Sequence, residues 1–284
     1  MVEAFSDCVS RDSWESRPSR VVMSTRCALD LFDRYGVKAT FFFVGWVAEK
    51  FPSLVREVHA RGHELACHSY WHRPVYSLTR EEFREDTRRA KSVIEQTAGV
   101  RVIGYRAPSW SITKSCLWAL DVLAEEEFLY DSSIYPIYHD LYGIPGAQRF
   151  GYTYRSRSGK PLQEMPPTTV RLLGMNLPAA GGGYLRVFPI AYTEWVFRHF
   201  ENRHGKPVVV YFHPWELDPE QPRLQSKLKS RIRHYLNLRR MQPRLERLFA
   251  THTFQPMNSY MGPQNAPEQQ EEENASQKLP LSAG

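Results

Sequence analysis

The alternation of apolar, strand-like segments with helical segments is the feature that most restricts how this chain can fold. Between residues 24 and 213 the two kinds of segment follow one another about six times. Strands that alternate with helices usually form a parallel sheet or barrel with the helices outside. The sequence therefore predicts an α/β fold without internal repeats.

The expected helices have apolar residues at helical spacing, and some have recognisable ends. Gly36 is placed to end the first helix. Thr79 and Glu82 predict a capping box at the start of a later one. Helices are expected over residues 24–35, 52–61, 79–97, 113–126 and 192–200.

The expected strands are short and rich in apolar residues. They are expected over residues 39–45, 64–67, 102–108 with an exit loop, 128–132, 162–165 and 207–213. The continuous apolar runs 39–45 and 207–213 predict buried strands, the first of them on both faces. Residues 135–163 predict a long loop of a length that is often functional, and Gly181–Gly183 predicts a turn.

Composition separates one folded domain from a polar tail. Residues 1–255 predict a single domain, and residues 256–284 predict a disordered tail because almost nothing after Gly262 is apolar.

No apolar run reaches the roughly 20 residues that a membrane helix needs. Residues 1–12 do not resemble a signal peptide, so the sequence as written predicts a cytoplasmic protein. Four widely spaced cysteines without a CxxC pair argue against a zinc ribbon or a disulfide scaffold.

The positive charge of the chain is concentrated in one segment. The net charge is +6, and much of it lies between Arg223 and Arg247. We interpret this run as a basic, partly helical surface that could make weak contact with an anionic lipid or polymer. A nucleic-acid binder is the alternative, and it predicts binding that falls steeply with salt. No recognisable nucleic-acid module is present, so no nucleic-acid partner is expected.

Polar residues at the ends of successive strands are the candidates for chemistry. His68 and His72, four residues apart, are expected on one face of a helical turn, where they could share a divalent ion. Arg106, Asp131 and His213 each end a later strand. Because the carboxyl ends of parallel strands meet at one edge, these side chains are expected to converge.

Each of these residues also has a purely structural explanation. An aromatic-flanked His is often a hydrogen-bonded structural residue. Arg106 could form a surface ion pair, Asp131 could cap a turn, and His213 before a proline could simply end a strand. The occurrence of all of them at the same end of the same layer favours a shared site over these separate explanations.

At these positions the chain resembles the polysaccharide deacetylases of carbohydrate esterase family four, which have the NodB-type fold. The resemblance covers about residues 1–250 and rests on four motifs: His68-Ser69-Tyr70-Trp71-His72, Arg106-Ala107-Pro108, Asp131-Ser132-Ser133 and Phe212-His213-Pro214-Trp215-Glu216. Two further segments, Arg171–Gly174 and Gly181–Tyr184, are similar to the subgroup linked to exosortase-type exopolysaccharide clusters. The resemblance implies a distorted (β/α) barrel with fewer than eight strands.

The resemblance also implies an activity and a role for each motif. The reaction would be hydrolysis of the N-acetyl group of N-acetylhexosamine units in a polysaccharide. A divalent ion, with zinc as the first choice and cobalt as another, would be held by His68 and His72. His213 would be the general acid, Asp131 would hydrogen-bond to it, and Arg106 would orient the base. Three aromatic residues could line the sugar groove or equally belong to the core: Trp110, Tyr135 and Trp215.

The chain departs from the family at its start. The family's first motif ends the first strand with two acids, one the base and one the third metal ligand, and no such strand is present here. Glu3, Asp7 and Asp12 are the only acids nearby, and none ends an apolar run. Either a native N-terminal segment is missing from this sequence, which could also change the expected location, or the protein is an incomplete homologue. For the chain as written we expect a barrel without its first strand, weak metal binding and almost no activity. A non-catalytic glycan-binding relative is the alternative function.

Overall fold

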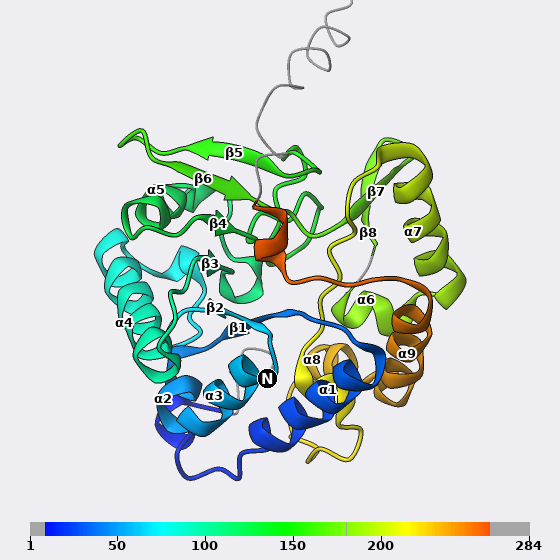
Figure 1. The fold of residues 1–284 in the computed structure, drawn as a ribbon, viewed down its shortest axis with the longest axis horizontal. Helices are drawn as coiled ribbons and strands as arrows, with labels where there is room; N and C mark the ends of the chain where they lie inside the picture. The colour runs from blue at the N-terminus through cyan, green and yellow to red at the C-terminus, as the bar shows by residue number, and fades with distance from the viewer. Residues whose placement is uncertain (1–8, 180, 262–284) are drawn as a thin grey trace, which may run out of the picture.

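The strands of this computed structural model form one large sheet and a separate hairpin within the described residues, 9–179 and 181–261. In spatial order the large sheet contains β1 (Thr40–Phe43), β2 (Glu64–Cys67), β3 (Gly104–Tyr105), β4 (Tyr130–Asp131), β6 (Pro161–Glu164) and β5 (Tyr152–Arg155). Neighbouring strands from β1 to β6 pair in parallel, and β5 pairs antiparallel with β6. The predicted α/β class and mostly parallel sheet are confirmed (Figure 1).

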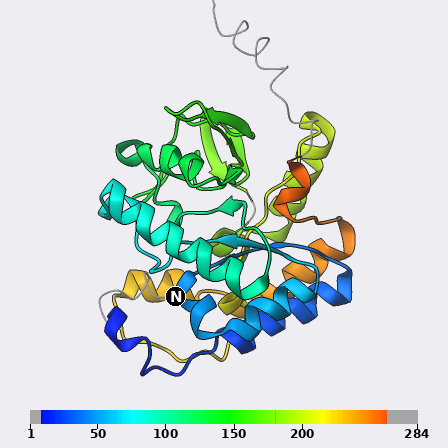
Figure 2. The same cartoon turned by 60° about the vertical axis from the view of Figure 1, so that its left-hand side comes forward.

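The helices lie outside this sheet. The first group is α1 (Val21–Tyr35), α2 (Gly45–Lys50), α3 (Pro52–Ala60), α4 (Arg80–Ala98) and α5 (Trp118–Glu125). The second group is α6 (Gly182–Val187), α7 (Ile190–His204), α8 (Leu228–Tyr235) and α9 (Met241–Thr251). Figures 1 and 2 show α3 and α4 on the outer side of the sheet, where both contact β2.

Two predicted helix ends are confirmed. Gly36 ends α1 with φ 64°, a left-handed conformation that glycine adopts without strain. At the start of α4 the Glu82 N–H donates to the Thr79 hydroxyl, and the Thr79 N–H donates to the Glu82 carboxylate at 2.8 Å. The helix expected from Thr113 begins later, because a short 3-10 turn over Lys114–Cys116 precedes α5.

The segment that follows β4 contains more β-structure than predicted. The expected loop 135–163 contains β5 and the start of β6, so that expectation was wrong. A second sheet, formed by β7 (Thr169–Leu172) and β8 (Met175–Pro178), was not predicted. These strands are short and carry polar residues, which weakens the apolar signal on which the prediction relied.

The expected strand over residues 207–213 does not join the sheet. Its one strand-type contact within the described residues is an isolated parallel bridge between Tyr211 and Gly181. β1 was expected to be buried on both faces, but three of its four residues are only half-buried. A cavity of about 3110 Å³ is lined by both β1 and residues 208–213. Hydrogen-bonded strands therefore do not close a barrel within the described part of the chain.

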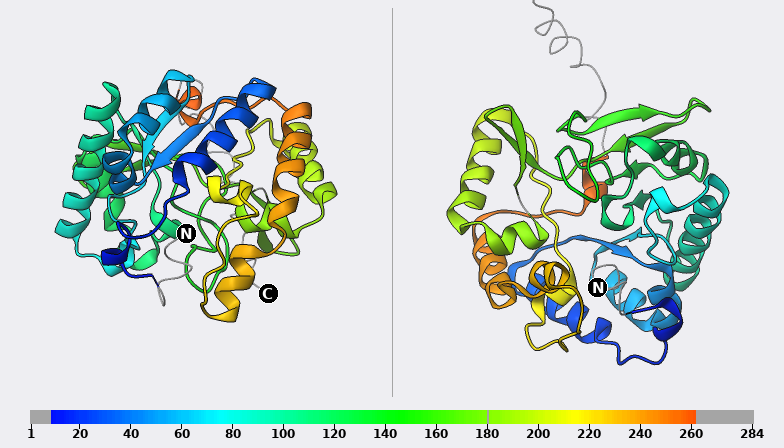
Figure 3. Two further views of the ribbon diagram at one scale, coloured as in Figure 1. Left: turned by 90° about the horizontal axis from the view of Figure 1, so that it is seen from below. Right: turned by 180° about the vertical axis from the view of Figure 1, so that it is seen from behind.

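Helices α1 and α9 cover the outer side of the molecule next to β1. The ring of Phe32 in α1 lies 6.0 Å from Phe41 of β1 and 5.5 Å from Phe249 of α9, measured between ring centroids. Figure 3 shows α1 beside α9 in the view from below. The basic run is helical as expected, and two of its cations, Lys229 and Arg233, form ion pairs with Asp140.

The predicted tail begins too early at residue 256. Residues Met257–Tyr260 form a 3-10 turn. The Met257 N–H donates to the Thr40 hydroxyl at 2.7 Å, and the Asn258 N–H donates to the Glu64 carboxylate at 3.0 Å. The rest of the predicted tail, residues 262–284, lies outside the described residues. None of the helices described between residues 9 and 261 combines the length and apolar character that crossing a bilayer requires.

The close approach of α2 to α4 gives a direct test of the packing. A Cβ added to Gly45 would lie 2.5 Å from the Tyr70 ring and 2.9 Å from the Ala90 backbone. We expect Gly45→Ala to lower the free energy of unfolding by about 1–3 kcal/mol, because overpacking forces the backbone apart. Gly146→Ala, which meets nothing within 4 Å, is the matched control. Urea unfolding of both variants measures the difference, and equal stability would contradict this packing.

Candidate active site

The loop over residues 68–72, the histidine loop, follows β2 and is not the predicted helical turn. Ser69 and His72 have φ values of 64° and 55°, in the left-handed region that non-glycine residues seldom adopt. Asp86 of α4 holds the loop, because its carboxylate accepts the backbone N–H of Tyr70 at 2.6 Å and that of the next residue at 3.2 Å. The Ser69 hydroxyl accepts the His72 N–H at 3.0 Å. Hydrogen bonds therefore impose the conformation that local sequence does not favour.

The two imidazoles meet as predicted. The Nε2 atoms of His68 and His72 lie 3.1 Å apart, and His68 Nδ1 lies 2.6 Å from the Arg106 carbonyl oxygen. With Nδ1–H donating to that carbonyl, His68 presents the lone pair of Nε2 toward His72. Two nitrogen ligands of a tetrahedral zinc ion are separated by about 3.3 Å. The pair therefore fits a divalent ion as two of its ligands.

Within the described residues no third ligand completes this pair. Among residues 9–179 and 181–261 no group of three or more His, Cys, Asp or Glu side chains is arranged to hold a metal ion. Two neutral nitrogen ligands leave the charge of a divalent ion uncompensated. The described residues therefore provide half of a metal site.

Arg106 contributes a positive charge to the same region. Its guanidinium donates to the Ser132 carbonyl and hydroxyl at 3.1 and 2.8 Å and lies 4.2 Å from the centre of the Phe42 ring. Burial lowers the pKa of Arg106 to about 10, so the group remains charged at neutral pH. It forms no ion pair with a carboxylate within the described residues. An anion near Phe42 would therefore be favoured.

His213 is oriented by Glu216 and not, as predicted, by Asp131. Its Nδ1 lies 3.1 Å from Glu216 Oε2, and the same oxygen accepts the His213 backbone N–H at 2.8 Å. The other Glu216 oxygen accepts from Arg186 Nε at 2.7 Å in a fully buried ion pair. Burial acts to raise the pKa of Glu216, but the hydrogen bond from His213 and the charge of Arg186 outweigh it, and the pKa is lowered. The proline turn Pro214–Leu217 brings these groups together.

Asp131 lies in a buried carboxyl pair. Its register partner on β6 is Glu164, and neither Asp131 Oδ2 nor Glu164 Oε2 has another hydrogen-bond partner within the described residues. The Ser133 hydroxyl donates to Asp131 Oδ1, and the Ile134 N–H donates to Glu164 Oε1. Burial raises the pKa of Asp131 to about 6; burial, reinforced by the Asp131 charge, raises the pKa of Glu164 well above its usual value. One proton shared between the two carboxyl groups explains this arrangement.

The predicted groove aromatics divide into two groups. Trp110 and Trp215 line the cavity, whereas Tyr135 is fully buried and does not. The Trp215 ring stacks on His234 with centroids 3.9 Å apart. Tyr138, which is 89% exposed, lines the cavity and was missed, although the tyrosine-rich loop was a signal for it.

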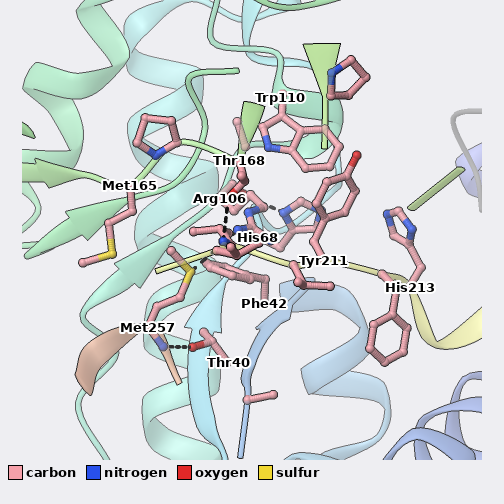
Figure 4. A pocket seen from close by; sticks show the side chains of 18 of the residues that line it. Thr40, Phe42, His68, Arg106, Trp110, Met165, Thr168, Tyr211, His213 and Met257 are labelled. Atoms are coloured by element: carbon pink, nitrogen blue, oxygen red, sulfur yellow. Dashed lines mark hydrogen bonds between the residues drawn. The ribbon is translucent and has the colours of Figure 1, made fainter. Parts of the chain in front are cut away.

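The predicted residues largely converge. Six of the eight line one cavity: His68, His72, Arg106, Trp110, His213 and Trp215. Figure 4 shows His68 and Arg106 close together under Trp110, with Tyr211 between this group and His213. The rings of Tyr211 and Trp110 are in contact at 4.4 Å. The cavity therefore has a histidine–arginine wall and an opposite His213 wall.

Comparison with known proteins agrees with this geometry. Residues 15–124 match the family model described as polysaccharide deacetylase, and residues 132–262 match a domain of unknown function, DUF3473. Two successive segments of the chain thus match these two family models. His68, His72 and Arg106 lie in the segment that matches the polysaccharide deacetylase model, and His213 lies in the segment that matches DUF3473.

Individual relatives are similar to the same part of the chain. A bifunctional xylanase/deacetylase of Pseudobutyrivibrio xylanivorans is 35% identical over 35% of this chain and 17% of the relative. A peptidoglycan-N-acetylglucosamine deacetylase of Bacillus cereus is 32% identical over 33% of this chain and 34% of the relative. A structure from Mycobacterium smegmatis, described as a putative polysaccharide deacetylase, matches 92% of this chain and 80% of its own, with 20% identity and a TM-score of 0.56, which supports the fold alone. The chain therefore spans about a third or less of the two curated relatives that it matches here.

The partner of His213 can be tested by its tautomer. With Glu216 accepting from Nδ1–H, the neutral ring carries its proton on Nδ1 and leaves Nε2 unprotonated. We expect Glu216→Gln to reduce the Nδ1–H population and to lower the free energy of unfolding by about 3 kcal/mol, because Arg186 loses its charge partner. Asp131→Asn is the control and should leave the tautomer unchanged. Nitrogen-15 NMR of the His213 ring measures the tautomer in both variants. A tautomer that changes in Asp131→Asn and not in Glu216→Gln would identify Asp131 as the partner.

The buried carboxyl pair predicts a pH dependence of stability. Because both folded pKa values are raised, the folded state holds protons that the unfolded state has released. Stability is therefore lost as the pH rises from about 4 through about 6 and beyond. We expect Glu164→Gln to remove much of this loss, on the order of 2 kcal/mol between pH 5 and pH 8, since glutamine can donate to Asp131 and still accept from Ile134. Urea unfolding at a series of pH values measures the stability of the parent and of Glu164→Gln. An equal loss of stability with pH in the two proteins would contradict the shared proton.

Proposed function

We propose that this protein is a metal-dependent N-deacetylase that acts on N-acetylhexosamine units of a polysaccharide, with an exopolysaccharide as the substrate class. The observation that carries the proposal is the 3.1 Å approach of the His68 and His72 Nε2 atoms in the cavity that His213 also lines. The deacetylase domain and the deacetylase activities of the relatives named above support the same reaction. Zinc suits two imidazole ligands, and cobalt suits the same geometry.

The residues of this chain have distinct tasks in that reaction. When bound, the metal ion would polarise the acetyl carbonyl and activate water. Protonated His213 would donate its Nε2 proton to the leaving amine, and Glu216 would stabilise the imidazolium through Nδ1–H. Arg106 would orient a carboxylate base or hold negative charge that develops on the substrate. Hydrolysis then gives a free amine on the sugar and acetate.

The described residues lack both a third metal ligand and a carboxylate base beside the histidine pair. We therefore propose that the described residues alone support only slow turnover. The same observation favours a second candidate, a non-catalytic protein that binds glycans in the cavity. Binding of chitin oligomers without acetate release at saturating zinc would select this second function.

Metal binding and activity test the first proposal together. We expect His68→Ala to weaken cobalt binding at least about tenfold, as measured by the visible absorption of the bound ion. His59→Ala, an exposed histidine of α3, is the matched control and should bind like the parent. Acetate release from chitin oligomers with zinc or cobalt should be slow and should fall about a hundredfold in His213→Ala. Fast acetate release would contradict the proposed slow turnover. Equal cobalt binding by His68→Ala and the parent protein would contradict a metal site at the histidine pair.

A further inference from the structure

Helix α8 has a row of exposed apolar side chains. Leu228, Ile232 and Leu236, the last of which directly follows the helix, are 69%, 49% and 42% exposed. Because successive helical residues turn by about 100°, residues spaced four apart lie within about 80° of one another on one face. Single exposed apolar residues are common on protein surfaces, but an aligned row of them is typical of an interaction surface.

Other residues of α8 fix the helix to the rest of the protein. Tyr235 is buried, and its hydroxyl accepts the Leu224 N–H at 2.9 Å. The buried His234 ring stacks on Trp215 with centroids 3.9 Å apart, and its Nε2 lies 2.7 Å from the Gln221 side-chain oxygen. The left view of Figure 3 shows α8 at the lower periphery of the molecule. The apolar row therefore lies on a firmly held helix at the surface.

Cations flank the apolar row. Lys229 and Arg233 lie on one side of it and Arg231 on the other, and all three are exposed. Residues 223–245 contain eight Lys or Arg and no acid. Asp140 pairs with Lys229 at 2.6 Å and with Arg233 at 3.0 Å, but one carboxylate cannot neutralise two cations. The exposed side of α8 is therefore both apolar and positively charged.

A second exposed apolar segment lies beside α8. The ion pairs of Asp140 tie the loop of residues 138–141 to the helix. Tyr138 and Leu141 of this loop are 89% and 54% exposed. Both line the large cavity, and so does Arg233 of α8. The apolar and cationic surface of α8 therefore continues to the cavity.

We propose that α8 and the loop 138–141 together bind the surface of an anionic lipid bilayer. The apolar row enters the boundary between headgroups and acyl chains, and the flanking cations contact lipid phosphates, as in basic amphipathic helices that lie in the membrane interface. A soluble polyanion needs the cations but not the apolar row, so the row favours a bilayer. In this orientation the cavity lies beside the lipid headgroups. Bilayer binding does not depend on the proposed deacetylation, so either proposal can fail without the other.

Vesicle sedimentation with the full chain tests the proposal. We expect binding to vesicles of phosphatidylcholine with phosphatidylglycerol, little binding to phosphatidylcholine alone, and weaker binding as the salt concentration rises. The double substitution Leu228→Gln with Ile232→Gln keeps every charge and should weaken binding at least about tenfold. Leu117→Gln with Leu129→Gln is the matched control and should bind like the parent, because these two leucines, each 40% exposed, lie on either side of α5 in the sequence. Equal binding by the α8 variant and the parent would overturn the proposal.

Other occupants of this surface give different results. Tight binding of polyphosphate without binding to anionic vesicles would assign the surface to acidic polymers and overturn the proposal. A dimer that Leu228→Gln with Ile232→Gln dissociates, again without vesicle binding, would assign the apolar row to a second copy of the chain. If that double variant fails to fold, Ile232→Trp decides the question, because brominated lipids in anionic vesicles should quench the fluorescence that it adds. Unquenched fluorescence at this position would overturn the proposal.

Discussion

Parallel strand pairing is the constraint on which the candidate site depends. The register from β2 through β3 to β4 aligns Cys67, Tyr105 and Asp131, so the residues that follow these strands emerge at one edge. His68 and Arg106 are the next residues after two of the strands, and the Arg106 carbonyl accepts the proton that fixes the His68 ring. The backbone ladder therefore positions His68 and Arg106, and the Asp86 carboxylate holds the loop that places His72 beside His68.

The other half of the site is positioned differently. Among the residues that the structure describes, the segment before His213 pairs with another segment only at Tyr211, so the ladder does not hold it. Its position depends on the buried ion pair of Glu216 with Arg186, whose guanidinium also donates to backbone carbonyls that include Arg233 and His234 at 3.0 Å. Loss of one partner of a fully buried ion pair leaves an unpaired buried charge and strongly destabilises the protein. The intact pair therefore holds His213 in a fixed position. A β-ladder and a buried ion pair thus fix the two walls of one cavity.

The features predicted correctly from the sequence are those whose determining residues all lie within a few positions of one another. The Thr79 capping box and the Gly36 cap depend on residues within one turn, and both formed. The histidine loop could not be predicted, because its left-handed residues are held by Asp86, a side chain from a different element. Glu216 was not predicted as the partner of His213, because the family resemblance implied Asp131 for that role. Glu216 lies only three residues after His213, in the proline turn. Apolar composition predicted burial for residues 39–45 and 207–213, but most of these residues are only half-buried because both segments line the cavity.

Charge limits the chemistry of this cavity more than geometry does. The histidine pair already has the spacing of two metal ligands, so no rearrangement is needed to seat an ion. Its nitrogens are neutral, however, and Arg106 beside them is a cation that stays protonated near neutral pH. The nearby carboxyl pair of Asp131 and Glu164 cannot offset this, because burial keeps a proton on it. A divalent ion would thus add positive charge to a wall that is already positive, so tight metal binding requires negative charge from beyond these residues.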